Sequence, residues 1–269
     1  MKKSLFYFIL SLVICQISCR KETANIPKGI KQIDLEYAFQ NTENISLSQI
    51  SSKIKYCQLE SRDSILVEEI KNIKIYDSLI FIMENQRLQV FNTKGNFISK
   101  IDNIGKGPGD ISTLWDFTYD PNKKKIILYD NSNVRVSKYN LKGKYINHWK
   151  PFNYFQNLAI LNDHYYVLQY ARPNNTAYNE NYYLAILNPQ YKVVNRLINK
   201  SAQEKTNLTK DVTQMHSQLY SFNDTLSAWQ FYDDIIYRII DSETVIPRYY
   251  FHLGKYRLPL KKRLEDPVP

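Results

Sequence analysis

The chain has 269 residues, of which 43% are hydrophobic and only three are cysteines. This length is enough to bury a core that folds without disulfides, and the cysteine count excludes the class of small disulfide-rich domains. The formal net charge is +10. A strongly positive charge is one feature of nucleic-acid-binding proteins. Because Lys and Arg are spread evenly among acidic residues, we expect a solvated surface and no nucleic-acid partner.

The N-terminus has the order of an export signal. Met1–Lys3 is positively charged, and Leu5–Ile14 is an apolar run too short to span a bilayer as a stable helix. The run ends in QISC, where a small residue precedes Cys19. This stretch resembles a bacterial lipobox, although Gln16 stands where leucine is usual. The resemblance implies a lipoprotein signal peptide at residues 1–18 and a lipid on Cys19.

This lipid would anchor the chain to a membrane of the cell envelope, at the outer membrane or its periplasmic face. Export is a further argument against a nucleic-acid partner. The alternative is an ordinary signal peptide in which the cysteine is incidental.

Three segments follow the predicted signal. Residues 19–45 are polar and aperiodic, which is typical of a flexible tether. Residues 46–254 form a succession of short apolar runs bounded by Asp, Asn or Gly, the pattern of a β-meander. Residues 255–269 are predicted to be a basic C-terminal tail.

Cys57 has no histidine motif nearby, and we expect it to be a small buried hydrophobic residue.

A repeat organises the meander. The stretches QVFNTKGNFI, SKYNLKGKYI and AILNPQYKVV align on Asn92, Asn140 and Asn188, which are 48 residues apart in each case. A fourth stretch, RIIDSETVIP, places Asp241 at this position after 53 residues. A repeat of this length with about four strands is typical of a β-propeller blade. We therefore predict an all-β fold with about four propeller blades.

The way the ring of blades closes is left open by the sequence. Propellers usually pair an N-terminal strand with the last blade, which removes an exposed sheet edge. Residues 45–60, ISLSQISSKIKYCQLE, offer one or two such strands. The repeats fit either a true four-bladed ring or a chain that stops before its ring is complete.

Motifs in the second repeat resemble a known family. DNSNVRVSKYN matches the NHL-repeat pattern D-x-x-N-x-R-V at Asp130, Asn133 and Arg135. Together with YCQLES, GKGPGD, DFTYDP and FHLGKYRLP, it resembles the six-bladed β-propeller lipoproteins of Bacteroidetes over about residues 45–259. The resemblance implies NHL-like four-stranded blades in an incomplete six-bladed ring, in preference to a four-bladed one. In the NHL-like pattern the Asp and Arg sit at strand ends, where they can pair and stabilise the blade.

A glycine-rich loop, GKGPGD, precedes this motif. Its structural residues are Gly105, Gly107, Pro108 and Gly109. The loop lacks the spacing of a P-loop and the third glycine of a dinucleotide-binding motif. Pro108 also removes a backbone N–H from the arc that would bind a phosphate. We interpret the loop as a crossing between the first and second blades.

No catalytic, cofactor-binding or metal-binding residue is predicted. The four histidines lack metal-ligand spacing, and neighbouring carboxylates such as Glu68 and Glu69 would point to opposite faces of a strand. The sequence thus favours a protein that is not an enzyme. Candidate ligand contacts are Trp115, Lys106 and Trp229, with Trp115 the strongest because it follows the loop directly.

We expect a binding or scaffold module for a glycan or a protein partner. The alternatives are an NHL-like lyase or hydrolase with a metal in the central channel, and a truncated product without a function of its own. Three Asp-[Ser/Thr]-apolar triplets also resemble the acceptor motif of Bacteroidetes O-glycosylation. They predict modification at Ser64, Ser78 and Thr225.

Overall fold

The computed structural model describes residues 29–162, 164–174, 182–198, 217–230 and 233–257. The chain divides into two compact units, Met1–Ile30 and Lys31–Pro269, and every element below belongs to the second unit. The predicted signal peptide, Cys19 and most of the predicted tail lie outside the described residues. No helix in the described part of the chain is long and apolar enough to cross a membrane.

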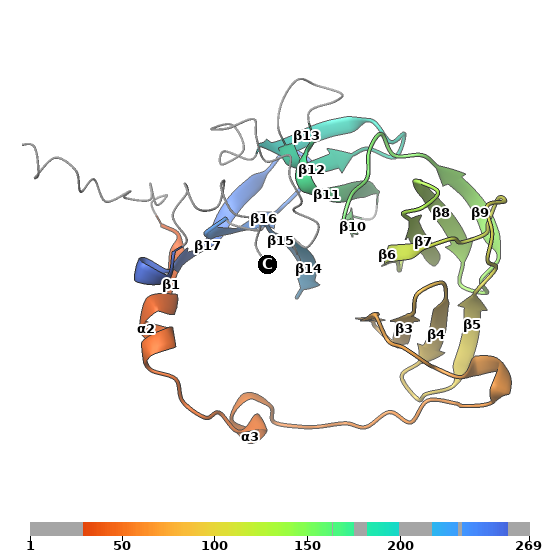
Figure 1. The fold of residues 1–269 in the computed structure, drawn as a ribbon, viewed down its shortest axis with the longest axis horizontal. Helices are drawn as coiled ribbons and strands as arrows, with labels where there is room; N and C mark the ends of the chain where they lie inside the picture. Colours follow the sequence, from red (N-terminus) through yellow and green to blue (C-terminus); the bar gives the residue numbers. More distant parts are fainter. Residues whose placement is uncertain (1–28, 163, 175–181, 199–216, 231–232, 258–269) are drawn as a thin grey trace, which may run out of the picture. The chain divides into compact units, whose positions relative to one another are not determined.

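All described strands except the first form four antiparallel sheets in which neighbours in the chain pair with each other, as Figure 1 shows. Blade 1 contains β2 (Asn72–Tyr76), β3 (Leu79–Met83), β4 (Leu88–Asn92) and β5 (Phe97–Ile101). Blade 2 contains β6 (Leu114–Asp120), β7 (Lys125–Asp130), β8 (Arg135–Asn140) and β9 (Tyr145–Trp149). Blade 3 contains β10 (Asn157–Leu161), β11 (Tyr165–Asn174), β12 (Tyr182–Leu187) and β13 (Val193–Ile198). Blade 4 contains β14 (Gln218–Phe222), β15 (Thr225–Trp229), β16 (Ile235–Ile239) and β17 (Val245–His252).

Blade 4 gains a fifth strand from the N-terminal side. Strand β1 (Lys31–Asp34) pairs in parallel with β17, and Asp34 then caps helix α2 (Leu35–Gln40) by accepting a hydrogen bond from the Tyr37 N–H at 2.9 Å. The predicted tether at residues 19–45 is therefore wrong for Lys31–Gln40. The backbone groups of β1 cover the edge of blade 4, which would otherwise be left unpaired.

The stretch 45–60, which offered closing strands, forms none. Its one regular element is the short helix α3 (Leu47–Ile50), and the 3₁₀ turn η1 (Asp63–Ile65) follows it. A second 3₁₀ turn, η2 (Gly254–Tyr256), lies at the other end of the described chain, after β17. Cys57 in this stretch is exposed, and its Sγ lies 3.5 Å from the Thr93 carbonyl oxygen. The expected burial of Cys57 is wrong because its segment runs along the surface instead of inside a sheet.

The 48-residue repeat corresponds to one hairpin in three blades. The Oδ1 atoms of Asn92, Asn140 and Asn188 each accept hydrogen bonds of 2.9–3.0 Å from the N–H groups two and four residues later. This bonding fixes the turn between the third and fourth strands. In blade 4 the turn is shifted by one residue, because Ile240 N, not Asp241 N, donates to the carbonyl oxygen four residues on.

The turn needs a residue with positive φ, and two blades use glycine. Gly95 has φ +89° and Gly143 has φ +77°. A Cβ on Gly143 would lie 2.5 Å from the Lys100 carbonyl oxygen of blade 1, so the glycine also permits close approach of two blades. Blade 3 has Tyr191 at this position with φ +62°. Its ring is stacked on Trp149 with centroids 4.6 Å apart, a contact that offsets the unfavourable backbone conformation.

The blades pack face to face through three apolar cores. The core between blades 1 and 2 includes Phe81, Val90, Phe117 and Leu128. The core between blades 2 and 3 includes Tyr129, Leu158, Leu168 and Tyr182. The core between blades 3 and 4 includes Val167, Leu184, Leu226 and Ile239. Each fully buried side chain of this kind contributes about 1.5–3 kcal/mol. Meander blades stacked in this way form the predicted β-propeller arrangement.

The glycine-rich loop is bound to blade 2 by the predicted motif residues. Asp130 accepts hydrogen bonds from the N–H groups of Ser112 at 2.9 Å and Thr113 at 3.2 Å, and from Asn133 Nδ2 at 2.7 Å. Arg135 donates to the carbonyl oxygens of Gly107 at 2.8 Å and Asp110 at 2.5 Å. Asp130 and Arg135 themselves approach only to 3.9 Å, so each binds mainly the loop backbone.

This bonding also shows why the loop is not a phosphate cradle. An anion site presents backbone N–H groups to its ligand. Here carbonyl oxygens at positions 107 and 110 point to a guanidinium, and the Gly107 N–H is bound to the Asp110 side chain at 2.9 Å. Tyr139 OH donates to the carbonyl oxygen of Gly109 at 3.1 Å. The loop therefore binds a cation that the protein itself supplies.

The loop contacts predict a large effect of Arg135→Lys. Lysine keeps the charge but loses the planar fork that reaches two carbonyl oxygens, so we expect the free energy of unfolding to fall by about 2–3 kcal/mol. Urea unfolding followed by circular dichroism measures this loss. Lys106→Ala is the control, because the exposed Lys106 side chain should contribute less than about 0.5 kcal/mol. Equal stability of Arg135→Lys and the unmodified protein would show that these bonds do not hold the loop.

Candidate functional site

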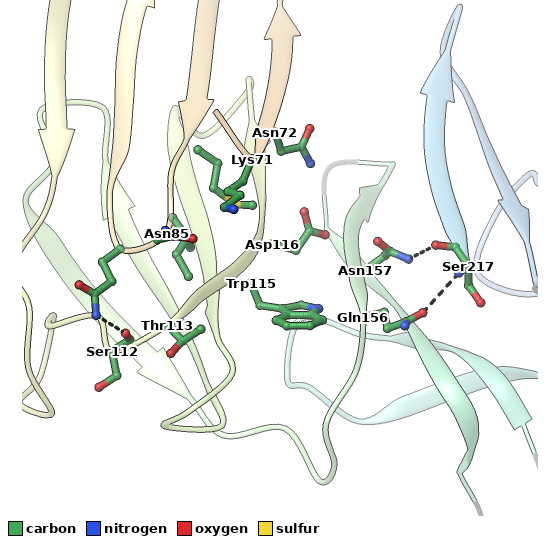
Figure 2. A pocket seen from close by; sticks show the side chains of 13 residues that line it. Lys71, Asn72, Asn85, Ser112, Thr113, Trp115, Asp116, Gln156, Asn157 and Ser217 are labelled. Carbon is green, nitrogen blue, oxygen red and sulfur yellow. Dashed lines mark hydrogen bonds between the residues drawn. The ribbon is translucent and has the colours of Figure 1, made fainter. Parts of the chain in front are cut away.

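A pocket of about 780 Å³ opens where the first strands of the four blades begin. This volume lies within the range of about 300–1,000 Å³ that is usual for small-molecule sites. The first strands are neighbours, since β10 contacts both β6 and β14, and Lys74 of β2 donates to Asp116 of β6. Figure 2 shows side chains from all four blades around this opening.

Each blade supplies its side chains from the same place in its fold. In each blade, one residue near the start of the first strand pairs with a residue at or near the end of the second strand. These pairs are Asn72 with Met83, Asp116 with Tyr129, Asn157 with Gln169, and Gln218 with Trp229. The pocket is lined by the first-strand residues of the first three pairs and by the residues that precede all four first-strand residues, Lys71, Trp115, Gln156 and Ser217. The propeller repeat thus brings equivalent positions of four blades together.

Strand alternation explains how these positions connect the blades. Successive side chains point to opposite faces of a sheet. Phe117 packs on blade 1 and Leu158 packs on blade 2, so each of these side chains points toward the preceding blade. The side chains just before them in the chain, those of Asp116 and Asn157, therefore point toward the following blade. Asp116 Oδ2 accepts the Leu158 N–H of blade 3 at 2.7 Å, and Asn157 Nδ2 donates to the Ser217 carbonyl oxygen at 2.8 Å. These bonds fix the first strands around the pocket.

Trp115 is the large aromatic side chain of the pocket. It is 46% exposed, although it belongs to a strand whose other side chains are buried. The β6–β7 register shifts between Leu114 and Asp116, and such a bulge redirects a side chain. Figure 2 shows the indole ring in the pocket between Thr113 and Gln156. The bulge therefore presents a flat apolar surface to any molecule in the pocket.

Both charged side chains of the pocket have a partner of opposite charge. Lys71 Nζ lies 2.5 Å from Glu69 Oε1, and this hydrogen bond and the Lys71 charge hold the pKa of Glu69 below its ordinary value. Asp116 is 5% exposed and lies 2.7 Å from Lys74 Nζ. The remaining polar lining consists of amides and hydroxyls, so the pocket is close to neutral.

Two lining groups are open for a ligand. The Asn72 side chain and the Trp115 indole N–H make no hydrogen bond to the described residues. The Gln86 and Asn157 side chains are instead held by backbone carbonyl oxygens of Ser112 and Ser217 at 2.8 Å each. The site thus combines two amide side chains that the protein holds in place, those of Gln86 and Asn157, with two groups that a ligand can bind, the Asn72 amide and the Trp115 indole N–H.

A smaller hollow of about 390 Å³ shares Asn85 and Gln86 with the pocket. Its carboxylate Glu84 is buried, and Arg87 donates to it through Nε at 2.7 Å and Nη2 at 2.8 Å. Burial works to raise the pKa of Glu84, but the bonds from Arg87, Gln89 and the Glu68 N–H outweigh burial and lower it. This carboxylate is therefore saturated by the protein and serves the fold.

The other predicted ligand contacts lie elsewhere. Lys106 is exposed, and its carbonyl oxygen is 3.4 Å from Arg135 Nη1. Trp229 donates its indole N–H to the Asp233 carbonyl oxygen at 2.8 Å. Neither residue lines the pocket around Trp115. In the described part of the chain, no three His, Cys, Asp or Glu side chains gather closely enough to hold a metal ion.

Sequence reasoning missed Asn72, Asp116 and Asn157. A signal for them exists: in each blade an amide or carboxylate residue directly precedes the apolar residue of the first strand, as in NIKI, DFTY, NLAI and QLYS. Of the predicted glycosylation residues, Ser64 lies in the 3₁₀ turn η1 and Ser78 in the turn between β2 and β3. Ser64 and Ser78 are exposed, whereas Thr225 is half-buried at the start of β15. Their modification stays a prediction.

The contacts of Asp116 predict different effects for two substitutions. Asp116→Asn keeps an acceptor for the Leu158 N–H and loses only the ion pair with Lys74. Asp116→Ala loses both and leaves a buried N–H without a partner, so we expect it to cost about 1–3 kcal/mol more than Asp116→Asn. Chemical unfolding of both variants measures the difference. Equal stabilities would contradict a bridging role of Asp116 between blades 1 and 3.

Comparison with solved structures supports the fold. A protein from Bacteroides fragilis NCTC 9343, named as a candidate exported protein, matches with a TM-score of 0.66 and 21% identity over 83% of this chain. This chain spans 60% of the length of that protein. Two further structures match more weakly. A DUF4221 family member from Bacteroides vulgatus ATCC 8482 has a TM-score of 0.43 and 13% identity, over 63% of this chain and 53% of that one. Virginiamycin B lyase from Staphylococcus aureus has a TM-score of 0.42 and 14% identity, over 66% of this chain and 54% of that one.

The comparison with curated proteins gave no match. Among family models, the one described as "Domain of unknown function (DUF4934)" matches residues 30–267, which includes every strand described above. The chain therefore belongs to the DUF4934 family.

Proposed function

We propose that the pocket around Trp115 binds a neutral glycan. The observation that carries this proposal is the half-exposed indole of Trp115, held by a β-bulge in a pocket otherwise rich in amides and hydroxyls. A sugar ring has an apolar C–H face, which can lie on an aromatic ring, and a rim of hydroxyls, which amide groups bind. The pocket offers both kinds of surface at once.

The charges of the pocket favour a neutral ligand over an anionic one. A phosphate or uronate would need an unpaired cation or a set of free N–H donors. Lys71 is paired with Glu69, and Lys74 reaches Asp116 instead of the open volume. An anion in this pocket would meet no unpaired cation among the lining residues and would have only the neutral donors of Asn72 and Trp115.

The lining also favours binding over catalysis. Lyase or hydrolase chemistry requires acid, base or metal-ligating side chains that converge on the ligand. Among the lining residues Asp116 is the single carboxylate, and its two oxygens are occupied by Lys74 and the Leu158 N–H. These contacts support a binding module.

We further propose that the chain is exported and anchored through a lipid on Cys19. The order of charge, apolar run and cysteine at residues 1–19 supports this proposal, as does the name of the Bacteroides fragilis relative. In this location the pocket would meet extracellular or envelope glycans. NHL-type blades and a six-bladed ring remain predictions from the resemblance.

Glycan binding is tested on an array of neutral and uronate-containing oligosaccharides, followed by calorimetry on the best ligand. We expect binding to neutral glycans and a loss of affinity of at least about tenfold in Trp115→Ala, because the stacking surface is removed. Phe152→Ala is the matched control, since Phe152 is 69% exposed and lies outside the pocket lining. Binding of uronates alone, or equal affinity of Trp115→Ala and the unmodified protein, would contradict the proposal.

The anchor is tested by growing cells that express the protein with a radiolabelled fatty acid. We expect label on the unmodified protein and none on Cys19→Ala, because the thiol of Cys19 is the predicted site of lipid attachment. Cys57→Ala serves as the control for the other cysteine of the exported chain and should keep the label. Label on Cys19→Ala, or none on the unmodified protein, would contradict the anchor while leaving the glycan proposal untouched.

A further inference from the structure

Each blade has two packing faces, and one face of blade 1 meets no blade among the described residues. We call the face toward the preceding blade the leading face and the opposite one the trailing face. In blades 2 and 3 the leading face begins with Phe117 and Leu158, both in inter-blade cores. The register pairs Phe117 with Leu128, Leu158 with Leu168 and Ile73 with Ile82, so Ile73 has the equivalent position in blade 1.

The leading face of blade 1 is as apolar as its counterparts but only partly covered. Leu59 and Val67 pack on Ile80 and Ile82, which are therefore buried. The strip along β2 stays open: Ile73 is 48% and Ile75 is 65% exposed, whereas Phe117 and Leu158 are 0% and 2% exposed. Leu66 and Ile70, which precede β2 in the chain, are 51% and 50% exposed. Ile73 and Ile75 thus form an exposed apolar strip on one face of β2, and two further exposed apolar residues precede them in the chain. Exposed apolar surface of this kind marks an interaction site.

Blade 4 has the complementary open face. By register, Phe222 of β14 is the equivalent of Leu161 of blade 3, which is buried in the core with blade 4. Phe222 is 65% exposed and Tyr220 of the same face is 37% exposed, whereas Leu161 and Ala159 at the equivalent positions of blade 3 are 4% and 8% exposed. The trailing face of blade 4 therefore exposes apolar side chains at two positions where blade 3 has buried ones.

We propose that this trailing face of blade 4 docks on the leading face of blade 1 in a second copy of the chain. The three described inter-blade cores each join a trailing face to a leading face, and the contact between copies would continue this series. The charges agree with this pairing. Glu68, whose side chain is 71% exposed, precedes β2, whereas Arg238 and Arg248 lie on blade 4. Arg248 Nη1 donates to Ser227 Oγ at 2.9 Å on the trailing face, so a cation of blade 4 lies on the side that would meet Glu68. Such a contact joins two different surfaces, head to tail.

The head-to-tail arrangement is tested with two variants that each block one half of the contact, Ile75→Glu and Phe222→Glu. Both are made in a Cys19→Ser background with reducing agent present, so that neither lipid nor the exposed Cys57 can cause association. Sedimentation velocity over a hundredfold concentration range measures the assemblies. Ile146→Glu is the control, because Ile146 is 40% exposed on β9, outside both faces. Unchanged thermal unfolding shows that the variants fold.

We expect the parent and Ile146→Glu to associate with rising concentration, and each blocking variant alone to be monomeric. A mixture of the two blocking variants should form a dimer and nothing larger, because each copy keeps one intact half of the contact. The mixture also reports on folding, since a misfolded variant could not restore the dimer. A parent that stays monomeric, association that survives in Phe222→Glu alone, or a mixture that stays monomeric would overturn the proposal.

Discussion

A four-stranded sheet with apolar residues on both faces cannot bury them alone, and this constraint determines most of the structure. The side chains of β3 illustrate it: Phe81 is buried against blade 2, whereas Ile80 and Ile82 on the other face are covered by Leu59 and Val67. Each blade depends on a neighbour for part of its core. The chain therefore stacks its repeats, and the same positions recur at every contact between blades.

The pocket is a consequence of this stacking. Since the first strands lie next to each other, the residues that open them face a common space. Successive side chains of a strand point to opposite faces of the sheet. Asp116 and Asn157 each stand just before a core residue of the first strand, so their side chains point to the next blade and bind backbone groups there. Strand β6 fixes the backbone of Trp115 within this scaffold, and an aromatic surface presented from a sheet binds a ligand with less loss of conformational entropy than one on a loose loop. The fold thus provides the preorganisation that the proposed glycan site needs.

Much of the fold could be predicted from the sequence, because the hairpin turn is a local signal. Asn92, Asn140 and Asn188 bond to their own turns, so their spacing reveals the repeat before any tertiary contact is known. Strand β1 was missed because its partner β17 is more than 200 residues away and its sequence, KQID, has no apolar alternation. Of the site, only Trp115 was predicted. Its exposure depends on a bulge, and the polar residues around it depend on the register of four separate blades.

The central claim is that a neutral sugar lies on Trp115, and the chain contains only three tryptophans with which to test it. The most direct measurement is a titration of the protein with a neutral oligosaccharide while the indole N–H signals are followed by nuclear magnetic resonance. Trp149 is buried beside Tyr191 and Trp229 is bound to the Asp233 carbonyl oxygen, so their signals serve as internal references. The account predicts a saturable shift of the Trp115 signal with the other two unchanged. An unchanged Trp115 signal at saturating sugar would contradict it.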